Sequence, residues 1–286
     1  MPSLIDIRRR IRSVKNTQQI TKAMKMVATA RLRKAQERVV NARPYSRMLS
    51  EMVANVASAA GAEAFTLHPL LAVREEKRVQ LVLVTADRGL AGSFNTNLIK
   101  AAQQLLDEHQ GKQVAMELCG RKGRDFFRRR EINVSGEVTG ISQSASYDNA
   151  ETLADTLIDR FTKGEIDSAY LIYNEFKSVL SQQVAIRRIL PLSLPGEQTG
   201  GRDYILEQPP AEFMKNLLPS YVEAQVFEAF LESAAAEHAA RMTAMDSATT
   251  NATEVIAKLT LYMNRVRQAT ITREIIEVVS GASALE

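Results

Sequence analysis

The C-terminal stretch, roughly Pro219–Ala284, constrains the fold most, because no glycine or proline occurs between Pro219 and Gly281. Its apolar residues recur mostly at steps of three and four, the spacing of one helix face. Ala, Ser and Thr form this stripe over Ser233–Ala257, which allows close helix pairing. A short helix over Glu212–Leu218 is expected to precede it through a kink. About 65 helical residues would span roughly 95 Å, so this helix must pair with another or enter a partner. An ordinary bundle helix is the alternative, and this length disfavours it.

The first 58 residues predict a second long helix. Apolar residues at helical spacing mark it: Leu4, Ile7, Ile11 and Val14, then Ile20, Met24 and Val27, then Ala28, Leu32, Ala35, Val39 and Ala42. The shift at Lys15–Gln19 predicts a stutter in a coiled-coil seam. Pro44 is expected to kink this helix or to end it at Arg43.

The same segment is strongly basic. Between Met1 and Arg47 there are 13 Lys and Arg residues and two acids, Asp6 and Glu37, so its charge is 13 − 2 = +11, whereas the whole chain carries +4. A helix of this kind must meet nucleic acid, anionic lipid or an acidic protein surface.

The middle of the chain alternates strands and helices. Strands are expected at Arg78–Thr85, Gln113–Cys119, Ile132–Val138, Ser168–Phe176 and Gln182–Ile189, and helices at Thr96–Glu108, Lys122–Arg129 and Asp148–Thr162. This order predicts an α/β fold, a Rossmann-like domain with a mainly parallel sheet. The simplest burial of both terminal stripes is a long antiparallel coiled coil attached to that domain. The expected domains are therefore residues 1–60, 77–208 and 209–286.

Composition excludes several kinds of site. The single Cys119 excludes an internal disulfide and a cysteine-based metal cluster. His68, His109 and His238 show no metal-ligand spacing, so no metal and no cofactor are expected. No apolar run is long enough to cross a bilayer, and no signal peptide is apparent. Membrane association would have to come through a partner.

One loop and one basic cluster invite a phosphate-binding interpretation. Gly89 and Gly92 follow the first strand, but their spacing fits neither nucleotide-binding glycine motif. A tight turn with Asp87 and Asn95 as local hydrogen-bonding residues is favoured. The cluster around Gly120–Gly123 is more typical of a solvated helix face. No nucleophile–base pair is apparent.

Five separated segments carry a family resemblance: Ile5–Arg12 (IDIRRRIR), Val14–Lys25 (VKNTQQITKAMK), Thr85–Asn95 (TADRGLAGSFN), Ala240–Ala244 (ARMTA) and Arg267–Ala284 (RQATITREIIEVVSGASA). Together they resemble the gamma subunit of the rotary, proton-translocating ATP synthases, in that family's order and over essentially the whole chain. The resemblance implies a central shaft inside a ring of alpha and beta subunits, with the α/β domain against epsilon and the membrane ring of c subunits. It implies no catalytic residues, because those lie in beta with contributions from alpha.

The resemblance also implies contact residues. A contact with beta is implied for Met24, Lys25, Arg241, Arg267, Gln268, Thr272 and Glu274; a foot against the c-ring and epsilon for Tyr204 and Glu207; and an apolar bearing for Val278, Val279, Ala282 and Ala284. The bearing would allow rotation without a fixed polar bond. The expected location is the cytoplasmic face of a bacterial inner membrane.

This sequence departs from parts of the family. Lys25 is acidic in some bacterial relatives, Leu206 replaces an aromatic residue, and one cysteine cannot form the chloroplast dithiol switch. Two other functions remain as alternatives: a basic coiled-coil protein that binds nucleic acid, and a nucleotide-dependent enzyme centred on Gly89–Gly92. With only Tyr45 as an aromatic residue in the basic arm, base stacking has little support.

Overall fold

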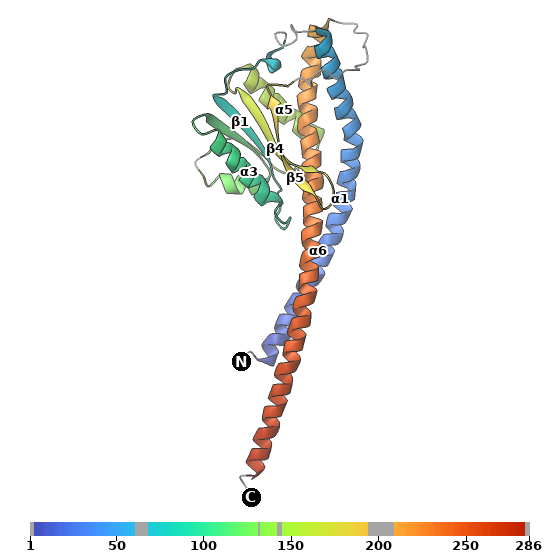
Figure 1. Cartoon of the computed structure of the whole chain (residues 1–286), viewed down its shortest axis with the longest axis vertical. Coiled ribbons are helices and arrows are strands. Elements are labelled where there is room, and N and C mark those ends of the chain that lie inside the picture. Colours follow the sequence, from blue (N-terminus) through green and yellow to red (C-terminus); the bar gives the residue numbers. More distant parts are fainter. Residues whose placement is uncertain (1–2, 61–67, 131, 142–144, 194–208, 284–286) are drawn as a thin grey trace. The chain divides into compact units, whose positions relative to one another are not determined.

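A computed structural model describes residues 3–60, 68–130, 132–141, 145–193 and 209–283. Its elements follow in the order α1 (Leu4–Ala60), the 3₁₀ helix η2 (Pro69–Leu71), β1 (Arg78–Val84), α3 (Phe94–Glu108), β2 (Gln113–Cys119), α4 (Arg121–Phe127), β3 (Asn133–Val138), α5 (Tyr147–Thr162), β4 (Ser168–Phe176), β5 (Gln182–Leu190) and α6 (Pro210–Ser283) (Figure 1). The predicted helix–α/β–helix order is confirmed.

The five strands form one sheet in the order β3-β2-β1-β4-β5. The first four strands pair in parallel, because a helix crosses over between each of them and the next. The last pair, β4 and β5, is antiparallel because only a short turn joins the two strands. The predicted mainly parallel sheet is confirmed.

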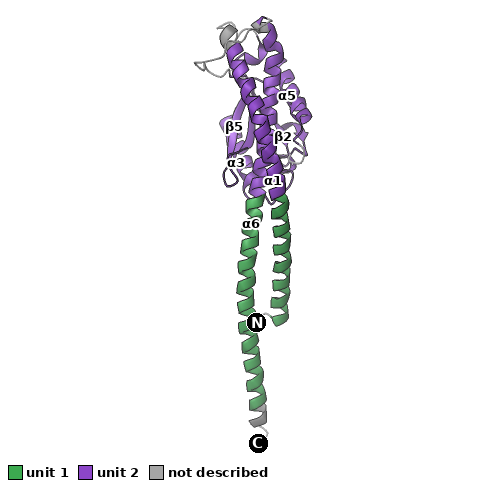
Figure 2. Ribbon diagram, turned by 90° about the vertical axis from the view of Figure 1, so that its right-hand side faces the viewer, with its two compact units in different colours: residues 1–28, 242–286 green, residues 29–241 purple. Residues whose placement is uncertain are grey.

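The chain divides into two compact units (Figure 2). Unit 1 contains residues 1–28 and 242–286, and unit 2 contains residues 29–241. Each unit therefore includes one part of α1 and one part of α6. The domain boundaries expected from the sequence follow the order of elements instead, and they stay a prediction.

In unit 2, α6 is buried on all sides from residue 229 to residue 239. Phe230 is fully buried there, and Ala235, Ala236 and Ala239 let neighbouring backbones approach closely. The small residues from 233 to 239 are thus buried, whereas most residues from 240 to 257 are half-buried or exposed, so close helix pairing along the whole run stays a prediction.

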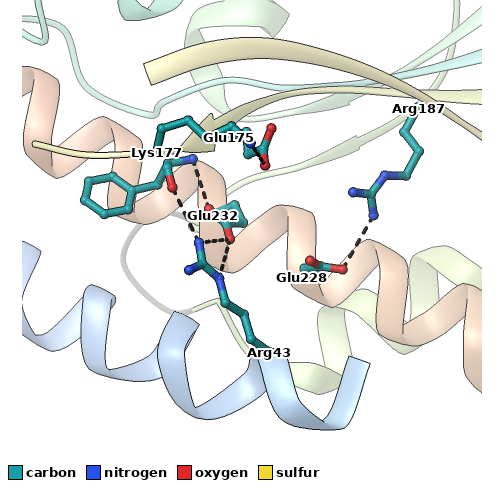
Figure 3. A network of polar contacts seen from close by, with 7 residues as sticks. Arg43, Glu175, Lys177, Arg187, Glu228 and Glu232 are labelled. Carbon is teal, nitrogen blue, oxygen red and sulfur yellow. Dashed lines mark hydrogen bonds and ion pairs between the residues drawn. The ribbon is translucent and has the colours of Figure 1, made fainter. Parts of the chain in front are cut away.

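A buried carboxylate joins three elements of unit 2 (Figure 3). Glu232 on α6, 4% exposed, accepts hydrogen bonds from Nη2 and Nε of Arg43 on α1 at 3.0 and 3.3 Å. Its other oxygen accepts the backbone N–H of Phe176 at the end of β4, at 2.9 Å. The charge is thus compensated on both oxygens, as a buried carboxylate requires.

A second buried carboxylate fixes the start of the sheet. Asp167 accepts the backbone N–H groups of Lys77 and Arg78 at 3.1 and 2.8 Å. It also accepts both ends of the Arg78 guanidinium, at 3.2 and 2.8 Å. The Arg78 side chain, and then these backbone bonds, hold the pKa of Asp167 below its usual value against the opposing effect of burial.

The seam of α1 in unit 1 is unbroken. Buried or half-buried positions alternate steps of four and three: Ile7, Ile11, Val14, Gln18, Thr21, Lys25 and Ala28. By contrast, Ile20 and Val27 are 61% and 54% exposed. The predicted stutter is therefore wrong: polar residues occupy the seam where the sequence pattern suggested a shift.

Neither long helix ends at its proline. Helix α1 continues through Pro44 to Ala60, and α6 starts at Pro210 and continues through Pro219. Pro44 is exposed, and the buried seam continues past it at Leu49, Val53 and Val56. Each proline removes one backbone hydrogen bond. Packing along the rest of the helix offsets this loss, so the helix continues past the proline.

Candidate partner-binding site

Polar pairs hold the two helices of unit 1 in antiparallel register. Gln18 donates to Thr253 at 2.7 Å, and the hydroxyls of Thr21 and Thr249 lie 2.8 Å apart. Lys25 forms an ion pair with Asp246 at 2.6 Å, with side chains 40% and 55% exposed. Polar groups inside a helical seam specify register at some cost in stability.

The sequence-predicted beta contact at Met24 and Lys25 lies in this coil. Met24 is half-buried, and Lys25 is engaged with Asp246. Other basic residues of this part of α1 form no ion pair with any residue that the structure describes: Arg8, Arg9, Arg10, Arg12, Lys15 and Lys22. Unit 1 thus presents an exposed positive helix face that matches an acidic surface.

In unit 1, helix α6 extends beyond the end of α1. The pairing of Thr21 with Thr249 and of Gln18 with Thr253 places Leu4 opposite Val266 or Arg267. From 271 to 280 every residue of α6 is exposed. This part of the helix is the unpaired excess that the unequal stripes predicted.

An apolar stripe runs along this unpaired end. Ile271, Ile275 and Val278 are 47%, 57% and 72% exposed, and steps of four and three place them on one helix face. The coil seam above ends at Thr270, about 100° around the helix from Ile271. The stripe is therefore a separate surface and not a continuation of the seam.

The predicted polar contacts border this stripe. Arg267, Gln268, Thr272 and Glu274 are all exposed, and the Thr272 hydroxyl donates to the Gln268 carbonyl at 3.0 Å. Helical spacing puts Arg267 and Glu274 on one side of the stripe and Gln268 and Thr272 on the other. We call these four residues with Ile271, Ile275 and Val278 the terminal face. Sequence reasoning missed Ile271 and Ile275, although their spacing to Val278 could have revealed them.

Arg241 has different surroundings, in unit 2. Its side chain is 11% exposed and pairs with the buried Glu237 at 2.6 Å. Its Nη2 also lies 3.3 Å from the carbonyl oxygens of Arg88 and Gly89 in the loop after β1. Arg241 belongs to unit 2, whereas the terminal face belongs to unit 1, and a partner could bind the Arg241 guanidinium only by replacing these contacts.

The remaining predicted contacts are only partly described. Tyr204, Glu207 and Ala284 lie outside the described residues, and for Ala282 only the helical backbone is described. Val279, like Val278, is exposed, at 57%. An apolar bearing at the end of α6 stays a prediction.

The glycine loop is built as a tight turn. The Asn95 side chain accepts the Ala86 N–H at 2.9 Å. Asp87 accepts the N–H of Arg121, the first residue of α4, at 3.2 Å, and that of Gly140 at 3.0 Å. The Asp87 carboxylate thus lies at the N-terminus of α4, beside the Gly120–Gly123 cluster, and not at the N-terminus of α3, which follows the glycine loop. The predicted local role is confirmed for Asn95, whereas that of Asp87 is wrong, because its carboxylate bonds to residues 34 and 53 positions further along the chain.

The part of the chain that the structure describes contains neither a metal-ligand cluster nor a membrane-spanning helix. Among the described residues, no cluster of three or more His, Cys, Asp or Glu side chains could hold a metal ion. No described helix combines the length and the apolar character needed to cross a membrane.

Comparison with known proteins identifies the family. The family model described as ATP synthase matches residues 3–285. The ATP synthase gamma chain of Solibacter usitatus is 61% identical, and that of Pelotomaculum thermopropionicum is 49% identical; each alignment covers 100% of both chains. The chain belongs to the ATP synthase gamma chain family. As a gamma chain it is a non-catalytic subunit, the central rotor shaft of a membrane-associated ATP synthase.

Solved structures support the fold of this gamma chain. A chain of the Euglena gracilis mitochondrial ATP synthase, from a structure of its OSCP, F1 and c-ring, has a TM-score of 0.68 at 20% identity, covering 99% of this chain and 94% of that chain. A chain of the Tetrahymena thermophila central stalk and c-ring structure has a TM-score of 0.60 at 24% identity, covering 80% and 99%. Neither the nucleic-acid-binding alternative nor the nucleotide-dependent enzyme gains support from these relatives.

Proposed function

We propose that this chain couples proton flow through a ring of c subunits to the catalytic sites of three beta subunits, which alternate with alpha subunits around it. Epsilon binds beside the chain near the c-ring, and the complex lies on the cytoplasmic face of a bacterial inner membrane. Residues 1–60 and 209–286 form the shaft, and residues 77–208 form the α/β domain. The bacterial origin of the relatives supports this location.

The observation that carries the proposal is the terminal face. Three large apolar side chains on an unpaired helix would be costly to leave in water, so they indicate a partner. The residues that border them can form directed hydrogen bonds, which hold one rotary state and break in the next. Beyond them, Val278, Val279, Ala282 and Ala284 would turn in the apolar bearing.

The positive face of α1 supports a second contact. Its unpaired cations require an acidic partner, and an acidic loop of beta would supply it. Met24 and Lys25 lie beside this face. In this proposal Tyr204 and Glu207 contact the c-ring and epsilon.

Coupling in a reconstituted complex tests the proposal. The chain is co-expressed with alpha and beta subunits of the same bacterium, and the complex is assembled on membranes for measurements of ATPase rate and ATP-driven proton pumping. Replacing Arg267 and Gln268 together by Ala should lower pumping per ATP hydrolysed. The control is Arg273→Ala, because this exposed arginine lies on the opposite side of the same helix segment.

The outcomes separate the claims. Normal pumping by the double variant would contradict the role of these two residues. Failure of the chain to assemble with alpha and beta, with ATPase unchanged by its presence, would contradict the coupling function. Circular dichroism of the isolated variants checks that both remain folded.

A further inference from the structure

Two cavities beside α1 in unit 2 differ in how their charges are compensated. The larger, of about 730 Å³, has four cationic and four carboxylate side chains among its lining residues. Each of these cations forms an ion pair with one of these carboxylates, including Arg43 with Glu232 and Arg187 with Glu228 (Figure 3). The described cations and carboxylates of this cavity therefore balance one another, and its charge gives no reason to expect an ionic ligand.

The smaller cavity, of about 340 Å³, has no such compensation. Among the residues that the structure describes, its lining contains Arg31, Lys34 and Arg38 from α1 and no carboxylate. Spacings of three and four residues place these three cations on one face of α1. None of them forms an ion pair with a residue that the structure describes. We call this cavity the basic groove.

The rest of the basic groove orients one of its cations. Its other lining residues are Ala35, Ala145, Ala234 and His238, three small residues and a histidine that is 6% exposed. Arg38 donates from Nη2 to the carbonyl of Ala145, which orients its guanidinium. Because the three alanine side chains of the lining are small, they leave space for a compact ligand beside the arginines.

We propose that the basic groove binds a phosphate group, held by Arg31, Lys34 and Arg38. Guanidinium forks match the oxygens of a tetrahedral oxyanion, and a lysine adds a point charge. The cavity volume suits free phosphate or the phosphates of a nucleotide, whereas a helix about 10 Å wide does not fit. Phosphate is a substrate of ATP synthesis. Occupancy of this site on the shaft would therefore depend on the concentration of one substrate of the complex.

Titration of the full-length chain with inorganic phosphate tests this site, with calorimetry and phosphorus NMR at constant ionic strength. We expect one saturable site. Replacing Arg31 and Arg38 together by Gln removes two charge-assisted contacts and should weaken binding by more than about tenfold. The matched control is Arg33→Gln, because Arg33 is 86% exposed and pairs with Glu37 outside the groove.

Three results would overturn the proposal. The first is the absence of saturable binding at constant ionic strength. The second is an equal loss in Arg33→Gln, which would show diffuse attraction to the basic helix. The third is binding of an acidic peptide at this groove without any binding of phosphate.

Two further measurements define the ligand and guard against misfolding. ADP that competes with phosphate for the same site would show that the groove also accepts phosphates carried by a nucleotide, which supports the proposal. Lys34→Gln serves as a second groove variant if the double variant unfolds, and it should also weaken phosphate binding.

Discussion

Two stretches of α6 have the same secondary structure and opposite surroundings. From 229 to 239, in unit 2, every residue is buried; from 271 to 280, in unit 1, every residue is exposed. The first stretch is rich in alanine and has few large side chains. The second contains Ile271, Ile275 and Val278, which are individually more apolar than alanine. Hydrophobicity alone therefore does not decide which part of this helix is buried.

The difference lies in what each stretch fits. Small side chains in 229–239 permit close approach of neighbouring elements, and the two carboxylates among them, Glu232 and Glu237, form internal ion pairs with Arg43 and Arg241. In 271–280 three of the apolar residues, Ile271, Ile275 and Val278, form one stripe with charged and polar residues beside it, a composition that suits an interface. The first stretch suits internal packing, and the second suits the contact with another chain that we propose.

The largest expected difference concerns core packing. Phe230→Ala leaves a cavity at a fully buried position and should lower the free energy of unfolding by about 3–5 kcal/mol. Ile275→Ala, at a side chain that is 57% exposed, should change it by less than about 0.5 kcal/mol. Urea denaturation of the isolated chain measures both, and equal losses would remove the distinction between the stretches.

Replacing a buried carboxylate should likewise lower the free energy of unfolding more than replacing an exposed one. Asp167→Asn weakens four hydrogen bonds and should cost about 2–3 kcal/mol at neutral pH. Glu274→Gln at the terminal face should cost less than about 0.5 kcal/mol.

The effect at Asp167 should depend on pH. Because its pKa is lowered in the folded chain, its stabilisation is present above the ordinary Asp pKa of about 3.9 and is lost as pH falls through the folded value. The gap between wild type and Asp167→Asn should therefore shrink in acid. A gap that stays constant down to pH 3 would contradict this account.

The sequence predicted the regular elements well. The strands Gln113–Cys119 and Ser168–Phe176 have the predicted bounds, because turn residues and changes of period mark their ends. Of the two outcomes expected at Pro44, a kink or a helix end at Arg43, the end is wrong, because α1 continues to Ala60 and packs through Leu49, Val53 and Val56. The stutter failed because Thr21 and Lys25 fill seam positions that an apolar pattern does not reveal.

The candidate site was only partly predictable. Unequal stripes indicated an unpaired helix end, and the family motif placed Arg267, Gln268, Thr272 and Glu274 there. The surroundings of Arg241 depend on a loop about 150 residues earlier in the chain, as its contacts with Arg88 and Gly89 show. Helical periodicity carries no information about such a contact.

The smallest expected effect concerns Arg241. The family resemblance assigns Arg241 and Arg267 to the same contact with beta, although one is largely buried in unit 2 and the other is exposed in unit 1. Replacing each of them therefore tests the difference between largely buried and exposed positions of α6. Arg241→Ala leaves the buried carboxylate of Glu237 without its ion-pair partner. Because the Arg241 side chain is 11% exposed, its removal should open the space beside Glu237 to solvent, so we expect a loss of unfolding free energy of about 1–2 kcal/mol rather than the larger cost of a fully enclosed buried charge. Arg267→Ala should cost less than about 0.5 kcal/mol.

A local readout separates an internal role for Arg241 from a general loss of stability. Amide hydrogen exchange in the loop at Arg88 and Gly89 should accelerate in Arg241→Ala and stay unchanged in Arg267→Ala, because only Arg241 contacts those carbonyls. Adding Glu237→Gln to Arg241→Ala should recover part of the lost unfolding free energy, because a neutral amide needs no opposite charge. Amide hydrogen exchange in the loop should remain fast in this double variant, because the arginine is still missing. Slow exchange in both arginine variants would mean that Arg241 does not hold the loop and that its guanidinium is available to a partner.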